Sequence, residues 1–166
     1  MAMNILLTGF CGTSSELLIK NAGYKSIILP NNRLIDSQLL IKEISLQRYD
    51  YIFGFGQKPN IKDKLYIETT ARNMTDRLNT NCEYDRLKSY FETNDLTVLI
   101  SDNAGTSFCN ALYWNGLNYI YNKGMDTRML FLHIPFCKNI TDSKSFFKRI
   151  LTAIEYLQTA YSGSVC

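Results

Sequence analysis

The sequence predicts an α/β fold in three layers, with helices on both faces of a central, mostly parallel sheet. Short apolar runs, typical of buried strands, alternate along the chain with longer amphipathic stretches, typical of helices. This alternation favours parallel strands, because each parallel pair needs a crossover helix. The chain has 166 residues, 46% of them hydrophobic, which is enough for a core without disulfide or metal cross-links. We expect one domain over residues 1–166.

The first three elements are a strand, a helix and a strand. Residues 4–10, NILLTGF, form a short apolar run that ends in glycine and predict a buried strand. Residues 13–23 begin with Thr and Ser, which cap helices well, and end at a glycine that predicts the helix stop. Residues 24–30, YKSIILP, predict the second strand, closed by proline.

The next segment continues the alternation and then breaks it. Residues 36–47 predict a helix capped by Asp36, with apolar residues four positions apart on one side. Residues 50–56, DYIFGFG, predict a third apolar strand. Residues 63–73, DKLYIETTARN, are rich in β-branched and aromatic residues and predict a strand with no helix before it. We therefore expect this strand to run antiparallel, which makes the sheet mixed.

The remaining elements alternate again. Residues 82–94 predict a helix, 96–101 a strand, 105–124 a long helix and 127–135 another strand. The last helix, over 143–161, has the clearest pattern. Its apolar residues recur at spacings of three and four on one face: Phe147, Ile150, Leu151, Ile154 and Leu157.

Charge and cysteine spacing argue against several function classes. The net charge is +3 without a run of five like charges, so we expect no nucleic-acid partner. Five widely spaced cysteines without a CxxC pair, and a single histidine, argue against a zinc site. The sequence has neither a signal-peptide pattern nor eighteen consecutive apolar residues. We expect a cytoplasmic protein with reduced thiols and no membrane contact.

The stretch SDNAGTSFCNALYW, residues 101–114, contains the candidate nucleophile, Cys109. If Thr106 caps the following helix, Cys109 lies in its first turn. Free N–H groups and the helix dipole there stabilise a thiolate and lower the thiol pKa. Apolar residues three and four positions further on would suit a buried core cysteine equally well. The residue pattern alone leaves both interpretations open.

His133, the only histidine, is the candidate base for Cys109. It lies at the end of the apolar strand FLHIP. The strands that precede Cys109 and contain His133 are consecutive, so we expect them to be neighbours that bring both groups to one edge of the sheet. Glu68, an acid within the strand at 63–73, is the candidate to orient the imidazole. Taken by itself, the residue pattern favours a Glu68 that faces water on an edge strand.

Together these segments resemble the pyroglutamyl peptidase I family, the pyrrolidone-carboxylate peptidases. SDNAGTSFCNALYW resembles the family's Ala-Gly and Cys-Asn-aromatic segment, and FLHIP its His-[IV]-Pro segment. IETTARN resembles its Glu-x-x-Ala-x-Asn segment, Gly56–Gln57 its Gly-Gln loop, and ILLTGF its opening strand. The order Glu, Cys, His is the family's order, and the resemblance covers most of the chain.

The resemblance implies a pyrrolidone-carboxylate-peptidase-like domain that removes an N-terminal pyroglutamyl (5-oxoproline) residue from peptides. It implies Cys109 as nucleophile, His133 as base and Glu68 as orienting acid, with a thioester acyl-enzyme and no metal or other cofactor. It also implies an arginine that stabilises the oxyanion, and Arg72 and Arg77 are the two candidates for this role. The implied substrate-binding residues are Phe10, Gln57, Asn73 and Arg77.

The chain also departs from the family pattern. The second aromatic residue after Gly-Phe and an Asn-Pro-Ser step are missing, and the stretch between Glu68 and Cys109 is shorter. Two alternatives therefore stay open. One is an amidohydrolase on the same scaffold that acts on a different small N-acyl or lactam group, and the other is a non-catalytic binding protein. The sequence is compatible with a homo-oligomer without determining the oligomeric state.

Overall fold

The computed structural model describes residues 3–162, so the ends of the expected domain over 1–166, including Cys166, lie outside the described residues. The strands are β1 (Ile5–Phe10), β2 (Lys25–Leu29), β3 (Tyr51–Lys58), β4 (Lys64–Glu68), β5 (Thr70–Arg72), β6 (Arg77–Asn79), β7 (Thr97–Ser101) and β8 (Arg128–Pro135). The helices are α1 (Ser14–Ile19), α2 (Arg33–Leu46), α3 (Tyr84–Thr93), α4 (Phe108–Asn122) and α5 (Ser143–Ser162), with a 3₁₀ turn, η1, at Cys137–Asn139. None of the described helices is long and apolar enough to cross a membrane.

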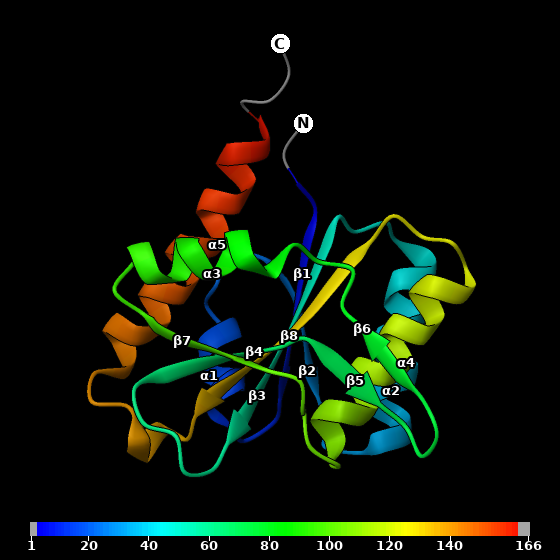
Figure 1. The fold of residues 1–166 in the computed structure, drawn as a ribbon, viewed down its shortest axis with the longest axis horizontal. Coiled ribbons are helices and arrows are strands. Elements are labelled where there is room, and N and C mark those ends of the chain that lie inside the picture. The colour runs from blue at the N-terminus through cyan, green and yellow to red at the C-terminus, as the bar shows by residue number, and fades with distance from the viewer. Residues whose placement is uncertain (1–2, 163–166) are drawn as a thin grey trace.

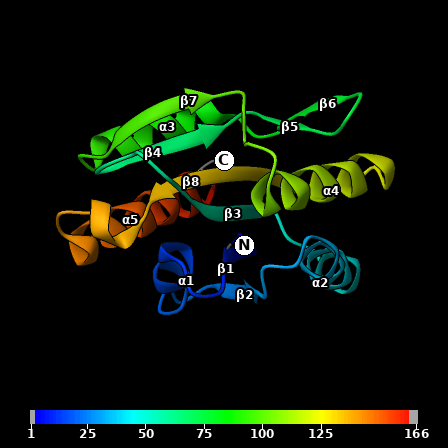
Figure 2. The same ribbon diagram turned by 90° about the horizontal axis from the view of Figure 1, so that it is seen from below.

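Six strands form the central sheet in the order β2-β1-β3-β8-β4-β7. The first four are mutually parallel, whereas β4 runs antiparallel to β8 and parallel to β7. Helices cover both faces of this sheet (Figures 1 and 2). The structure thus confirms the predicted three-layer α/β fold with a mixed, mostly parallel sheet, and it confirms the antiparallel strand after β3.

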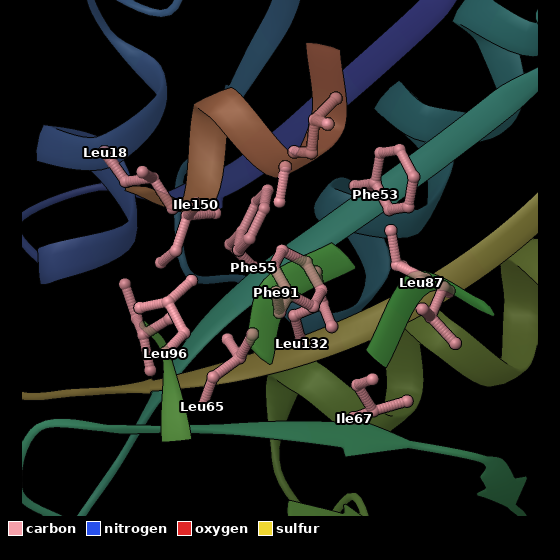
Figure 3. Close-up of a cluster of buried hydrophobic side chains, with 14 of the residues drawn as sticks. Leu18, Phe53, Phe55, Leu65, Ile67, Leu87, Phe91, Leu96, Leu132 and Ile150 are labelled. Carbon is pink, nitrogen blue, oxygen red and sulfur yellow. The ribbon is translucent and has the colours of Figure 1, made fainter. Parts of the chain in front are cut away.

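Two apolar clusters hold the layers together, one on each face of the sheet. On the first face, which we call the α5 face, side chains of α1, α3 and α5 pack on the sheet. Phe55, Phe91 and Leu132 lie together at the centre of this cluster (Figure 3). On the opposite face, which we call the α4 face, α2 and α4 pack on alternate residues of the same strands. Cys109 belongs to this second cluster.

Two predicted helix starts were wrong by a few residues. The second helix begins at Arg33 with Asn32 as its N-cap, whose side chain accepts hydrogen bonds from the N–H groups of Leu34 and Ile35. Asp36 is therefore not a cap, and it is fully buried one turn inside the helix. The helix that contains Cys109 begins at Phe108 with Ser107 as its N-cap, one residue after the predicted cap Thr106, and Gly105, with a positive φ of 84°, lies in the loop before it.

The strand predicted over 63–73 is two strands in two sheets. It breaks at Thr69, whose N–H donates to the carbonyl oxygen of Ser101, and β5 then leaves the main sheet to pair with β6. The resulting hairpin lies beside α4 (Figure 1). The expectation that β7 and β8 are neighbours was also wrong, because β4 lies between them.

Candidate active site

Glu68 and His133 meet on the α4 face because β4 and β8 are antiparallel neighbours. Glu68 pairs with Phe131, and Tyr66 pairs with His133. Residues on one face of such a pair also contact each other diagonally. Glu68 Oε1 lies 2.7 Å from His133 Nδ1, and the two side chains are 0% and 5% exposed. The imidazole is thus held through one nitrogen, which leaves Nε2 free of the Glu68 contact.

The Glu68 carboxyl has a pKa below its usual range. Burial raises this pKa. The hydrogen bond to His133, the nearby Ser101 hydroxyl and the charge of Lys58 together lower it by more than burial raises it. The Lys58 ammonium lies 3.2 Å from the same Oε1 atom. The other oxygen, Oε2, is buried and makes no hydrogen bond with the described residues. Glu68 is therefore an ionised carboxylate at neutral pH.

Cys109 approaches this pair from above the sheet, in the first turn of α4. Gly56 of β3 is paired in register with His133, and a Cβ added to Gly56 would overlap the Cys109 Sγ atom. Residues paired in register point to the same face of a sheet. The thiol therefore lies over Gly56 on the face to which His133 points. The Phe131 ring packs edge-on against His133, with ring centroids 5.2 Å apart.

The ionisation of Cys109 differs from the sequence-based expectation. Burial raises the pKa of the thiol to about 12, and the charges of Glu68 and Asp36 add to this rise. The residue's own backbone N–H and the charge of Lys58 oppose it only in part. The expected lowering by the helix N-terminus is outweighed because the thiol is almost completely buried, with 9% exposure. Cys109 is thus a neutral thiol at neutral pH.

Side chains of α4 attach the helix to the strands that contain the other site residues. The Tyr113 hydroxyl donates to the Glu68 carbonyl oxygen at 2.9 Å. The Asn110 amide accepts from the N–H of Arg72 at 2.9 Å and donates to its carbonyl oxygen at 2.7 Å. These bonds fix the first turns of α4, and hence Cys109, relative to β4 and β5.

The two arginines considered for the oxyanion differ in their surroundings. Arg72 and Arg77 face each other in register across the β5–β6 hairpin. Arg72 turns toward the loop before α4, where its Nη2 donates to the backbone oxygen and the carboxylate of Asp102. The Nε of Arg72 is buried without a partner among the described residues, whereas Arg77 is exposed. Arg72 is therefore the better candidate for a site residue, because it is partly buried beside the loop that leads to Cys109, whereas Arg77 faces solvent.

The structure brings some of the proposed substrate-binding residues to Cys109 and not others. Phe10 is buried in the same apolar cluster as Cys109. Asn73 lies in the hairpin turn, where its side chain accepts hydrogen bonds from the N–H groups of Thr75 and Asp76, and it lines a cavity of about 860 Å³. Gln57 lies on the opposite face from Gly56, and its amide oxygen accepts from Ser14 of α1. Gln57 and the exposed Arg77 are thus apart from the thiol.

The large cavity lies between the start of α2, the start of α4 and the β5–β6 hairpin. Its lining includes Arg33, Arg72, Thr106, Asn110 and Trp114. Cys109 does not line this cavity, but the next residue of α4, Asn110, does.

Sequence reasoning missed two site features. The first is Lys58, which follows the Gly-Gln step and lies beside Glu68. A single lysine at the end of a strand forms no sequence pattern that could predict this contact. Asp36 was assigned to a cap, although helical spacing from the buried Leu40 would have put it on the core side. An acid on the buried face of a helix is a usable signal, because it needs a partner. Among the described residues, no group of three or more His, Cys, Asp or Glu side chains could hold a metal ion.

Replacing Gly56 with alanine is expected to displace the Cys109 thiol, because the new Cβ would overlap Sγ, and to lower the kcat/KM of a reaction at this thiol at least ~100-fold. Gly116→Ala is the matched control, since its Cβ would press on the Met129 sulfur at 2.5 Å, two turns along α4 from Cys109. Both variants should lose thermal stability, and only Gly56→Ala should lose most of its activity. Equal activity losses at equal melting temperatures would show that displacement of the thiol is not the cause.

Fold and site together define a class of protein: α/β proteins in which a buried cysteine at a helix start lies over a histidine–carboxylate pair of the sheet. Comparison with known proteins bears on the family and the fold. No protein-family model matches the chain. A pyrrolidone-carboxylate peptidase of Thermoanaerobacter sp. strain X514 is 25% identical over 169 residues, covering 81% of this chain and 83% of that protein.

Solved structures extend the comparison. The pyrrolidone carboxyl peptidase of Fervidobacterium islandicum AW-1 superposes with a TM-score of 0.84 at 17% identity, covering 95% of this chain and 99% of that one. Pyroglutamyl peptidase I of Bacillus amyloliquefaciens gives 0.83 at 18% identity, covering 98% and 96%. The resemblance to the pyroglutamyl peptidases that the sequence motifs predicted is therefore confirmed.

Proposed function

We propose that this protein is a cysteine peptidase that removes an N-terminal pyroglutamyl residue from peptides. The observation that supports this most strongly is the arrangement of Cys109 over the buried His133–Glu68 pair. The names of the similar proteins support the substrate, since they are pyrrolidone-carboxylate and pyroglutamyl peptidases. We also propose a cytoplasmic location, because a reducing compartment keeps Cys109 a free thiol, the form in which it occurs here.

Because the thiol is neutral before substrate binds, attack begins with a proton transfer. The Cys109 Sγ proton passes to His133 Nε2 as Sγ bonds to the carbonyl carbon that joins pyroglutamate to the next residue. The Glu68 carboxylate holds Nδ1–H and stabilises the imidazolium that forms. The result is a tetrahedral intermediate with a negative charge on the former carbonyl oxygen.

Two groups could stabilise that oxyanion. The first turn of α4 has backbone N–H groups without helical partners, including that of Cys109. Arg72 is the better-suited arginine, because its partly buried guanidinium borders the loop before α4. Collapse of the intermediate breaks the C–N bond, and His133 gives its proton to the leaving amine. The remaining acyl group is a thioester on Cys109.

Deacylation reverses the proton flow. His133 Nε2 takes a proton from a water molecule, whose oxygen attacks the thioester carbon, and the C–S bond breaks. The proton returns to Cys109 Sγ as 5-oxoproline leaves. Every proton in the cycle passes through His133, so the reaction needs no metal and no redox partner.

The proposal is tested by matched substrates. L-Pyroglutamyl-7-amido-4-methylcoumarin and L-prolyl-7-amido-4-methylcoumarin differ only in the ring carbonyl and in the basicity of the ring nitrogen. We expect release of the fluorophore from the pyroglutamyl amide and at least ~100-fold lower kcat/KM for the prolyl amide. Failure to hydrolyse either amide would contradict the proposed substrate and favour another N-acyl substrate or a non-catalytic role.

A further inference from the structure

Lys58 is a cation beside the site that the steps of the proposed reaction do not use. It is the last residue of β3, two residues after Gly56, so its side chain points to the same α4 face of the sheet. Its ammonium lies 3.2 Å from Glu68 Oε1, and the Lys58 side chain is 31% exposed whereas that of Glu68 is 0% exposed. Lys58 thus reaches from the solvent-facing border of the site to its buried carboxylate.

Lys58 and His133 contact the same oxygen of Glu68. His133 Nδ1 lies 2.7 Å from Oε1, while the other oxygen, Oε2, is buried without a hydrogen bond to the described residues. The ammonium and Nδ1 are therefore no more than about 6 Å apart, a distance at which charges affect each other's ionisation. The Tyr66 ring of β4, with its centroid 4.9 Å from the ammonium, helps to hold Lys58 in this position.

This arrangement affects the base, because His133 must be uncharged to accept the proton of Cys109. A buried carboxylate needs a countercharge, and it favours a protonated imidazole beside it for that reason. Lys58 already supplies a countercharge at the same oxygen, and its own charge repels an imidazolium at this distance. The protonated form of the His133–Glu68 pair, which cannot act as base, is therefore less stable with Lys58 than without it.

Other titratable groups around the pair do not supply this countercharge. Cys109 and Tyr113 of α4 have pKa values raised by burial, that of Cys109 to about 12, so both are neutral near neutral pH. Arg72 of β5 is paired with Asp102. Asp36 of α2 is an acid, and a negative charge there would favour an imidazolium. The countercharge therefore comes from Lys58.

We propose that Lys58 is a positioning residue that keeps His133 unprotonated at pH values where the His133–Glu68 pair alone would hold a proton. Lys58 acts through Glu68 and touches no reacting atom. Its effect is to extend activity toward lower pH. This catalytic consequence rests on the proposed function, whereas the protonation of the pair can be measured without a substrate.

The single histidine of the chain gives a direct readout of the pair. In protein without a histidine tag, the imidazole Cε1–H signal comes from His133 alone, and its NMR titration reports proton uptake by the coupled pair. Lys58→Met removes the charge and keeps most of the side-chain length. We expect its titration midpoint about one pH unit above that of wild type, because loss of the cation stabilises the protonated pair.

Three further variants support this measurement. Lys58→Arg keeps a cation, and we expect its midpoint within about 0.3 pH unit of wild type. Lys58→Gln should shift the midpoint in the same direction as Lys58→Met, and it replaces that variant if the methionine prevents folding. Lys64→Met removes an equal charge from the same face of β4, four residues or about 13 Å along the strand from Glu68, where salt screens the interaction. We expect no shift for it.

The catalytic consequence is measured as the pH dependence of kcat/KM on the pyroglutamyl amide. We expect the acid limb to move to higher pH in Lys58→Met by the same amount as the midpoint. The ratio of wild-type to variant kcat/KM should then rise by up to about tenfold from the alkaline plateau to the acid limb. A merely structural role would lower the melting temperature and reduce activity equally at every pH.

The outcomes separate this inference from the proposed function. A Lys58→Met midpoint at or below that of wild type, or an equal shift in Lys64→Met, would overturn the inference. A shifted midpoint without a shifted acid limb in an active enzyme would overturn the catalytic role of Lys58. A shifted midpoint in a protein that hydrolyses no pyroglutamyl amide would contradict the proposed function and support the effect of Lys58 on the pair.

Discussion

Replacing Cys109 with alanine is expected to abolish hydrolysis of pyroglutamyl amides, with a loss of at least ~10⁴-fold in kcat. The variant keeps the His133–Glu68 pair but has no atom that can form the thioester. Because alanine is smaller than cysteine and the site is buried, the free energy of unfolding should drop only by about 1 kcal/mol. Activity is measured on the coumarin amide, and stability by thermal unfolding.

Cys82→Ala is the matched control for this variant. Cys82 is also buried, and burial likewise raises the pKa of its thiol to about 12, but it belongs to the cluster on the opposite face of the sheet. We expect Cys82→Ala to lose similar stability and to keep wild-type activity. Residual activity in Cys109→Ala, or equal losses in both variants, would exclude Cys109 as the nucleophile.

Replacing Glu68 with glutamine is expected to lower kcat by about 10³- to 10⁴-fold. Glutamine is nearly isosteric, so the hydrogen bond to His133 can persist. Its neutral amide cannot stabilise the imidazolium, and its NH₂ group can donate to Nδ1 and force the wrong tautomer. The substitution also removes the charge that faces Lys58. KM should change much less than kcat, because Glu68 is behind the imidazole and not against the substrate.

The control for this variant is Glu43→Gln. Glu43 also lies near a lysine, at 3.8 Å from Lys25, and accepts a hydrogen bond from the Tyr49 hydroxyl, but it is remote from Cys109 along the sheet. Wild-type activity of Glu43→Gln beside an inactive, folded Glu68→Gln would support the orienting role. A Glu68→Gln variant within about tenfold of wild type would contradict it.

The mixed sheet explains how the three groups come together. In a purely parallel sheet, functional groups gather beyond the carboxyl ends of the strands. Here Glu68, at the end of β4, is opposite Phe131 in the middle of β8, and Ser101, at the end of β7, is beside Glu68. The loop after β7 therefore begins over the middle of the sheet. It leads into α4, so Cys109 lies on a face of the sheet and not at its edge.

The sequence by itself determined the fold class, the order of the helices and main-sheet strands along the chain, and the identity of the candidate groups, but not the β5–β6 hairpin. Periodicity found the helices and strands, and the short motifs around Cys109, His133 and Glu68 carried the resemblance that the comparisons confirmed. These features are local, because a strand, a cap or a motif depends on residues close together in the chain. Phe10 was likewise found from its motif and lies in the cluster of Cys109.

Only the tertiary structure decided which groups meet. β7 and β8 follow each other in the sequence and are joined by α4, but β4 lies between them in the sheet. This position of β4 brings Glu68 to His133. Strand alternation turns Gln57 to the opposite face from Gly56, and helix packing buries Asp36 near the thiol. The pKa of Cys109 is raised because helix packing also buries its thiol. Pairing across a sheet and loss of solvent depend on residues far apart in the chain, so no local pattern in the sequence could report them.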